Sequence, residues 1–177
     1  MNVLGDIPVK ELQPYLRKSN ARGIAQLTFN WLLIASAFAL VAWNPHPIII
    51  VLALLIMGGR QLGLAILMHD CAHYSLFKSR ALNEHLGQWL CASPLYISLK
   101  GYRKYHLDHH GTAGTERDPD LVNYKNYPVS AASFCRKVIR DIVGLTGSKT
   151  LIVVLRMNLG LIEYRYSFEP VQASPKD

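Results

Sequence analysis

The chain has 177 residues, of which half are hydrophobic and 18% are charged, and its formal net charge is +7. Its mean hydropathy of +0.13 and a charged fraction below the ~25% usual for soluble globular proteins favour membrane spans over one large soluble core. Basic residues flank the apolar segments and no aromatic-rich nucleic-acid motif is present, so we expect no nucleic-acid partner. Three widely spaced cysteines without a CxxC pair indicate neither a zinc ribbon nor a redox pair.

The first part of the chain predicts a transmembrane helical hairpin. Residues 1–23 are polar and are typical of a short cytosolic tail with room for an interfacial helix, not of a secretory signal peptide. Residues 24–43 carry no charge and residues 48–68 carry only Arg60, so each is long enough to cross a ~30 Å hydrocarbon core. The uncharged turn around His46 joins them, which places both basic flanks on the cytosolic side.

Two features of the second span predict how it packs. Arg60 is costly in lipid, so we expect it to face protein or reach water. Burial against neighbouring helices is favoured over a position lining an acyl channel. Gly59 and Gly63 form a GxxxG pattern, which permits close helix approach, and in a hairpin this favours packing against the first span over dimerisation.

The first histidine cluster reads HDCAH at 69–73. No helix breaker separates it from the second span, so it is predicted to extend a membrane helix into the cytosol. On such a helix His69 and His73 lie on one face. The apolar segment Leu86–Leu99 is too short to span and contains Pro94. We interpret it as an interfacial or re-entrant segment that returns the chain to the same side, and His85 at its start as a polar cap.

The second histidine cluster reads HLDHH at 106–110. On a helix His106 pairs with His109 or His110. Adjacent His109 and His110 diverge by roughly 100°, so they could serve two metal ions, or one ion and a bridging ligand. Two such clusters near an apolar helix indicate a metal site.

The ligand types narrow the choice of metal. Imidazole suits zinc, copper, iron and nickel. A zinc hydrolase of the HExxH kind needs a glutamate where this chain has Asp70. Soluble di-iron bundles use glutamate ligands, but Glu84 and Glu116 lie outside both clusters. A histidine-rich polynuclear site beside a membrane points towards iron and oxygen chemistry.

Four segments together resemble the membrane fatty acid desaturases: HDCAH at 69–73, NEHLG at 83–87, YRKYHLDHH at 102–110 and TERDPDL at 115–121. The resemblance implies a di-iron centre that uses dioxygen to insert a double bond into a fatty acyl lipid. It also implies an electron-donor protein, either ferredoxin or a cytochrome b5-like carrier. The iron ligands that it implies are His69, His73, His106, His109 and His110.

The sequence departs from that family at one point. The family has a third HxxHH box near its C-terminus, whereas no histidine follows His110 here. Five imidazoles are too few to surround two irons. The chain 1–177 therefore resembles a single incomplete desaturase domain, its N-terminal portion, with a histidine region at 69–121, and we expect it to be inactive by itself.

The remaining segments predict surface features. Lys100, Arg103 and Lys104 suit phospholipid headgroups or an acidic electron donor. The DPD segment 118–120 resembles a family feature that supplies acceptors to ligand imidazoles, and its plain interpretation is a helix start with Pro at the first position.

Interfacial helices are predicted over 131–162. Residues 131–145 are amphipathic, with Phe134, Val138, Ile142 and Leu145 on one face and basic residues on another. This pattern is typical of a membrane-surface helix. Residues 151–162 are apolar but too short to span, and residues 163–177 form a polar tail.

The predicted fold is an all-α membrane protein, a transmembrane hairpin followed by cytosolic and interfacial helices that carry the histidine clusters. The predicted function is acyl-lipid desaturation in an integral membrane protein whose clusters face the cytosol. A lipid or carotenoid hydroxylase or ketolase is the alternative enzyme. A haem-binding membrane protein or an inactive fragment is the alternative from another class, and a haem absorption spectrum separates haem from non-haem iron.

Overall fold

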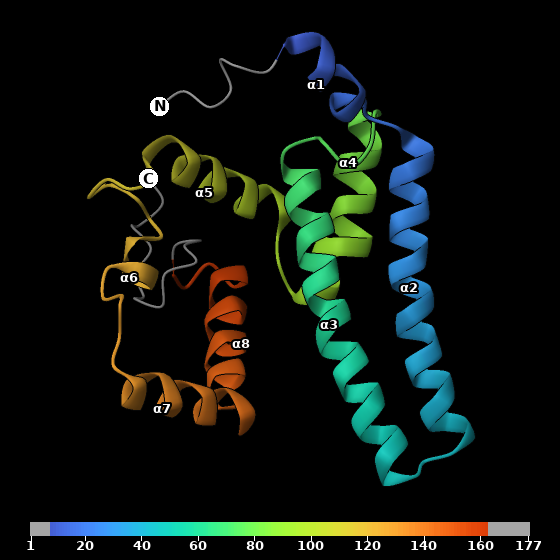
Figure 1. Cartoon of the computed structure of the whole chain (residues 1–177), viewed down its shortest axis with the longest axis vertical. Coiled ribbons are helices and arrows are strands. Elements are labelled where there is room, and N and C mark those ends of the chain that lie inside the picture. The colour runs from blue at the N-terminus through green and yellow to red at the C-terminus, as the bar shows by residue number, and fades with distance from the viewer. Residues whose placement is uncertain (1–7, 163–177) are drawn as a thin grey trace. The chain divides into compact units, whose positions relative to one another are not determined.

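The computed structural model describes residues 8–162, which form two compact units that divide between Gly87 and Gln88 (Figure 1). As predicted, the fold is all-α, without a β-strand in the described range. The helices of the first unit are α1 (Val9–Leu16), α2 (Asn20–Trp43), α3 (Pro47–Ala72) and α4 (Arg80–Leu86). A π-helical segment η2 (Gly87–Ala92) and a 3-10 turn η3 (Ser93–Leu95) lead on to α5 (Leu99–Thr112), α6 (Leu121–Tyr124), α7 (Ala131–Ile142) and α8 (Leu145–Asn158). The first seven residues of the predicted cytosolic tail and the polar segment 163–177 lie outside the described residues.

Helices α2 and α3 form the predicted hairpin, and both start slightly earlier than hydropathy alone indicates (Figure 1). Helix α2 begins at Asn20 because Ser19 caps it, accepting a hydrogen bond from Arg22 N at 3.4 Å. Helix α3 begins at Pro47, a favoured first helical residue. The His46 side chain accepts a hydrogen bond from Ile48 N at 3.3 Å, which confirms that His46 is a turn residue.

By length and composition, α2 and α3 are both sufficient to cross a membrane. Only 22% of the most apolar window of α2 and 11% of that of α3 are buried in the structure, whereas the core helix of a soluble protein is mostly buried. Large side chains such as Leu32, Leu54 and Leu55 point outward and are more than half exposed. This apolar exterior suits a lipid environment.

A polar contact between Asn30 and Arg60 links the two helices of the hairpin. The buried residues of α2 recur every three or four positions and are Gly23, Leu27, Asn30, Ile34 and Ala37. Arg60 Nη1 donates to Asn30 Oδ1 at 3.3 Å, and Asn30 Nδ2 donates to the Arg60 carbonyl at 3.5 Å. Arg60 thus faces protein, as its cost in lipid predicts.

The GxxxG prediction is half right. A Cβ on Gly63 would lie 2.3 Å from Asn30 Oδ1, so this glycine permits the close approach of α2. A Cβ on Gly59 would meet no atom within 4 Å. Gly59 is therefore not part of the α2–α3 contact, because only one of the two glycines faces Asn30.

Segment Leu86–Leu99 is not one helix. Helical turns end at Leu95, after Pro94, and Tyr96 then adopts a left-handed conformation with φ 60°. Gln88 holds the chain beyond this turn, since its Oε1 accepts from Leu99 N at 2.9 Å and its Nε2 donates to the Ile97 carbonyl at 3.3 Å. These bonds position the start of α5. The interfacial or re-entrant interpretation of this segment stays a prediction.

Two predicted helix boundaries are wrong. Helix α7 ends at Ile142, because Gly144 takes the left-handed conformation (φ 78°) that terminates helices. Leu145 therefore starts α8 and does not share the face of Phe134. Helix α6 starts at Leu121 after Asp120, not at Pro119, because Asp120 N donates to Asp118 Oδ1 at 2.8 Å in a turn that precedes the helix.

Candidate metal centre

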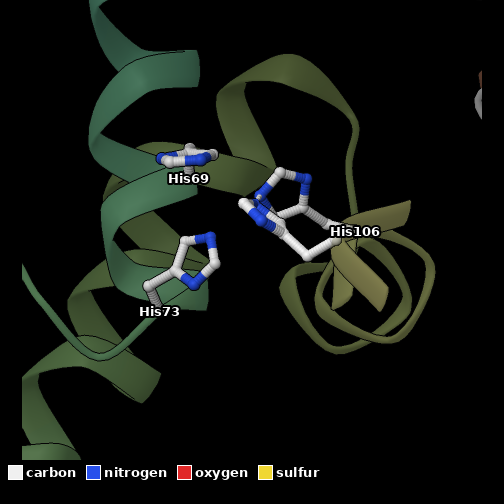
Figure 2. A group of neighbouring side chains, drawn as sticks. His69, His73 and His106 are labelled. Atoms are coloured by element: carbon white, nitrogen blue, oxygen red, sulfur yellow. Dashed lines mark hydrogen bonds between the residues drawn. The ribbon is translucent and has the colours of Figure 1, made fainter. Parts of the chain in front are cut away.

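The first histidine cluster lies at the C-terminal end of α3. His69 is in the last turn, and His73 is the first residue after the helix, with its N–H donating to the His69 carbonyl at 3.2 Å. The helix was predicted to include His73, but it ends one residue earlier, at Ala72. Their ring centroids are 4.8 Å apart, and their ligand nitrogens lie within 4.8 Å of each other. Figure 2 shows the two rings side by side at the end of α3.

A turn directly after His73 fixes the exit of this cluster. Tyr74 has a positive φ of 54°, which is strained for a residue with a bulky side chain. Its hydroxyl donates to a Glu84 carboxylate oxygen and accepts from Arg80 Nη2 at 3.3 Å. The Arg80 guanidinium also stacks over the Tyr74 ring at 4.5 Å. Glu84 thus belongs to a network that supports the cluster, which sequence reasoning missed because it depends on the left-handed turn.

The NEHLG segment also has a structural role. Asn83 is fully buried. Its Nδ2 donates to the carbonyls of Phe77 and Ser79, both at 2.8 Å, and its Oδ1 accepts from Phe77 N at 3.2 Å. These bonds tie the loop after the first cluster to α4. His85, two residues further on, is exposed, in keeping with a polar cap.

The second histidine cluster lies on α5, which Ser98 caps by accepting from Gly101 N at 3.3 Å. His106 and His110 share a face as predicted, with their Nε2 atoms 3.0 Å apart. Tyr102 stacks on His106 with centroids 5.1 Å apart. Figure 2 shows the His106 ring on this helix. The His109 ring is directed towards Asp118, and its centroid lies 6.1 Å from that of His106.

His109 is oriented by a buried carboxylate. Its Nδ1 lies 2.7 Å from Asp118 Oδ1, and the Asp118 side chain has no exposed surface. Asp120 Oδ2 lies 3.5 Å from the same nitrogen. A proton on Nδ1 that is donated to the carboxylate leaves the Nε2 lone pair for a metal ion. The DPD segment therefore supplies acceptors to the imidazole of His109, while the ligand role of His109 stays a prediction. In the first cluster, His69 Nδ1 lies 3.2 Å from Asp70 Oδ1.

The Asp118 carboxylate is held in its charged form. Burial alone would raise its pKa, but hydrogen bonds outweigh this effect and hold the pKa well below its usual range. Tyr124 OH donates to Asp118 Oδ2 at 2.5 Å, and the Gly114 N–H does so at 3.3 Å. The same bond raises the pKa of Tyr124, since losing the phenol proton would place a second charge beside the carboxylate. Asp118 thus remains an acceptor for His109.

The imidazoles of the second cluster have a spacing that fits one bound metal ion. For a metal–nitrogen distance of about 2.1 Å, the 3.0 Å separation of the His106 and His110 Nε2 atoms corresponds to an N–metal–N angle of about 90°. The pair suits two adjacent positions of one ion. His69 and His73 offer a second pair of nitrogens within 4.8 Å. An all-nitrogen set fits iron, copper, nickel or zinc.

The family model for the fatty acid desaturases matches residues 43–174. The chain belongs to the fatty acid desaturase family. The match covers both histidine clusters and the DPD segment. No solved structure matches the chain.

Three relatives show the range of the family. The chain is 36% identical over 111 residues to the dihydrorhizobitoxine desaturase of Bradyrhizobium elkanii, covering 60% of this chain and 30% of the relative. It is 32% identical over 135 residues to the sn-1 acyl-lipid omega-3 desaturase (ferredoxin) of Nostoc sp. (strain 36), covering 74% and 35%. It is 36% identical over 95 residues to the beta-carotene ketolase of Paracoccus sp. (strain PC1), covering 51% and 35%. The chain thus spans about a third of the length of these relatives.

Proposed function

We propose that the protein is a membrane-bound fatty acyl desaturase with a histidine-ligated di-iron centre. The observation that carries the proposal is the arrangement of the two clusters, both inside the family match, with paired ring nitrogens near the end of α3 and on one face of α5. The proposed ligands are His69, His73, His106, His109 and His110. The proposal requires the two clusters to meet at one centre.

When bound, iron supplies the activation of dioxygen that attack on an unactivated C–H pair requires. The chain's own contribution is the orientation of the imidazoles. Asp118 holds His109 through Nδ1, and Asp70 lies beside the same atom of His69. The network of Tyr74 and Glu84 fixes the backbone beyond His73. Such partners keep each Nε2 directed at the metal.

The length of α3 supports a lipid substrate. A hydrocarbon core of ~30 Å takes about 20 helical residues at 1.5 Å each. Counted from Pro47, the first residue of α3, these residues end near Ile66. His69 then lies within about one turn of the hydrocarbon boundary, where an acyl chain can approach it.

We also propose that a ferredoxin-like carrier supplies the electrons. Two relatives are named as ferredoxin-dependent acyl-lipid desaturases. Lys100 and Lys104 are exposed on α5, one turn apart, and suit an acidic donor surface. Reversing both charges should raise the ferredoxin concentration needed for half-maximal turnover, while an unchanged dependence would exclude this surface.

The direct test expresses the native gene, in its full reading frame, in a host that lacks the desaturase. Gas chromatography of membrane lipids should show a new double bond, and metal analysis of the purified protein should show about two non-haem irons by family resemblance. His106→Ala should abolish both signals. His85→Ala, which removes an exposed histidine outside the clusters, should leave them unchanged. Full activity of His106→Ala would remove the second cluster from the site.

Oxygenation of a carotenoid is the second candidate, favoured by the identity to the Paracoccus ketolase. The same imidazoles would then serve C–H oxidation with oxygen retained in the product. Mass spectrometry of lipids and carotenoids separates the two, because desaturation removes two hydrogens and ketone formation adds oxygen. A Soret band in the purified protein would instead indicate haem and contradict both.

A further inference from the structure

Helix α7 carries an apolar face that the other described residues of its unit, 88–162, leave largely exposed. Phe134, Val138 and Ile142 recur every four residues, with Ile139 beside them. Their exposed fractions are 55%, 37%, 79% and 60%, respectively. Contiguous apolar surface of this kind marks an interaction site.

The opposite face of α7 is basic. Arg136 and Arg140 lie one turn apart and, with Ser133 and Ile139, line an open hollow along the helix. Lys137 is paired with Asp141 at 3.5 Å, whereas neither arginine forms a salt bridge with a carboxylate among residues 8–162. Two guanidinium groups and a hydroxyl are a donor set that suits phosphate.

We propose that α7 lies on the surface of an anionic lipid bilayer, with its apolar face among the acyl chains and Arg136 and Arg140 on headgroup phosphates. An apolar face with a basic face opposite is the pattern of helices that lie in the membrane interface. The same chain carries two helices long enough to cross a membrane, so a bilayer is always within reach. The inference goes beyond the proposed function and does not depend on the metal.

Cys135 provides a built-in probe. It lies next to Phe134 on the apolar side of α7 and is exposed, whereas Cys71 and Cys91 are buried. An environment-sensitive NBD fluorophore on Cys135 of the full chain would report whether this face enters lipid. Nanodiscs holding one copy of the chain exclude self-association, and their lipid is either phosphatidylcholine alone or a mixture with phosphatidylglycerol. Cys135→Ser treated in the same way gives the background.

The expected result is a blue-shifted emission in the anionic discs and little shift in the neutral ones. Each basic residue near an anionic surface contributes about fivefold to the partition, so Arg136→Ala with Arg140→Ala should weaken insertion by about 25-fold and reverse the shift. Arg117→Ala with Lys125→Ala removes the same charge outside α7 and should leave the shift intact. Circular dichroism checks that both double variants remain helical.

Three outcomes would overturn the proposal. A probe that stays in water in both kinds of disc would show that the face is not inserted. An equal shift in both lipids would show insertion without recognition of anionic headgroups. A shift seen only when several copies share a disc would assign the face to a second copy. Iron content and product formation are measured separately, so failure here leaves the proposed function standing, and the reverse also holds.

Discussion

Asp118 is the residue whose surroundings bear most directly on the candidate site. Its fully buried carboxylate accepts hydrogen bonds from Tyr124 and two backbone N–H groups and lies 2.7 Å from His109 Nδ1. Asp118→Asn keeps the shape but removes the charge that fixes the imidazole. We expect the affinity of the second histidine cluster for a divalent metal to fall by about 10–100-fold, measured by titration with Co²⁺.

Asp108→Asn is the matched control, because Asp108 is exposed on the same helix and lies between the same histidines in the sequence. Its affinity for Co²⁺ should be unchanged. Thermal unfolding of both variants separates loss of metal from loss of fold. Equal Co²⁺ affinity of Asp118→Asn and the unaltered chain would show that the carboxylate does not orient His109.

The Tyr74 network offers a second prediction at this scale. Tyr74→Phe removes the hydroxyl that joins Glu84 and Arg80 but keeps the ring under the guanidinium. These hydrogen bonds, one partly buried and one exposed, are lost without leaving a cavity, so we expect a destabilisation of about 1 kcal/mol in chemical unfolding. Tyr127→Phe, at an exposed ring, should change little. A Tyr74→Phe variant as stable as the original would show that the hydroxyl does not hold this turn.

Of these two networks, one could be predicted from the sequence and the other could not. The acceptor role of the DPD segment could be predicted, because ligand imidazoles need partners and carboxylates follow the second cluster within ten residues. The Tyr74 turn could not, because a left-handed tyrosine has no sequence signal of its own. The role of Asn83 also depends on three carbonyl and amide groups that only the folded loop brings together.

At the scale of elements, the α2–α3 contact rests on a glycine and a polar pair. Gly63→Ala would place a methyl group 2.3 Å from Asn30 Oδ1, which must then move away from Arg60. Gly59→Ala meets nothing within 4 Å. Both changes gain the same helix propensity. The difference between the stabilities of the two variants therefore measures the contact of residue 63 with Asn30. We expect Gly63→Ala to be less stable than Gly59→Ala by about 1–3 kcal/mol, measured by unfolding in detergent micelles.

The element boundaries show which physical signals the sequence carries. Hydropathy located both long helices. Their first residues are set by capping at Ser19 and His46, which a hydropathy average does not detect. The period of residues 131–145 predicted α7, but the helix ends at Ile142 because of the conformation of Gly144. A glycine in a sequence permits a left-handed turn without requiring one.

At the scale of the molecule, the all-α fold and the membrane-length hairpin follow from composition and hydropathy, and the family follows from the histidine motifs. Whether the two histidine clusters meet at one centre cannot be predicted in the same way. It depends on the path of residues 86–99, whose short helical turns carry too little periodicity to set a direction. That meeting remains part of the proposal, with metal binding as its test.

The final prediction concerns the orientation of the hairpin in a membrane. At 1.5 Å per residue, the 24 residues of α2 and the 26 of α3 are each longer than a ~30 Å hydrocarbon core. The turn at 44–46 has no charge, while Lys78 and Arg80 follow the other end of α3 and Arg17, Lys18 and Arg22 flank the start of α2. Positive residues remain in the cytosol, so the turn should face outward.

Single cysteines at the two ends of the hairpin test this orientation. Asn44→Cys is preferable to a change at His46, which caps α3, and Lys78→Cys marks the exposed loop after the first histidine cluster. Cys135→Ser removes the exposed native thiol, while Cys71 and Cys91 are buried. An impermeant maleimide should label Asn44→Cys in intact cells and Lys78→Cys only after permeabilisation. The reverse pattern would invert the hairpin, and equal labelling of both in intact cells would mean that α2 and α3 do not cross the membrane, because one crossing must separate the two ends.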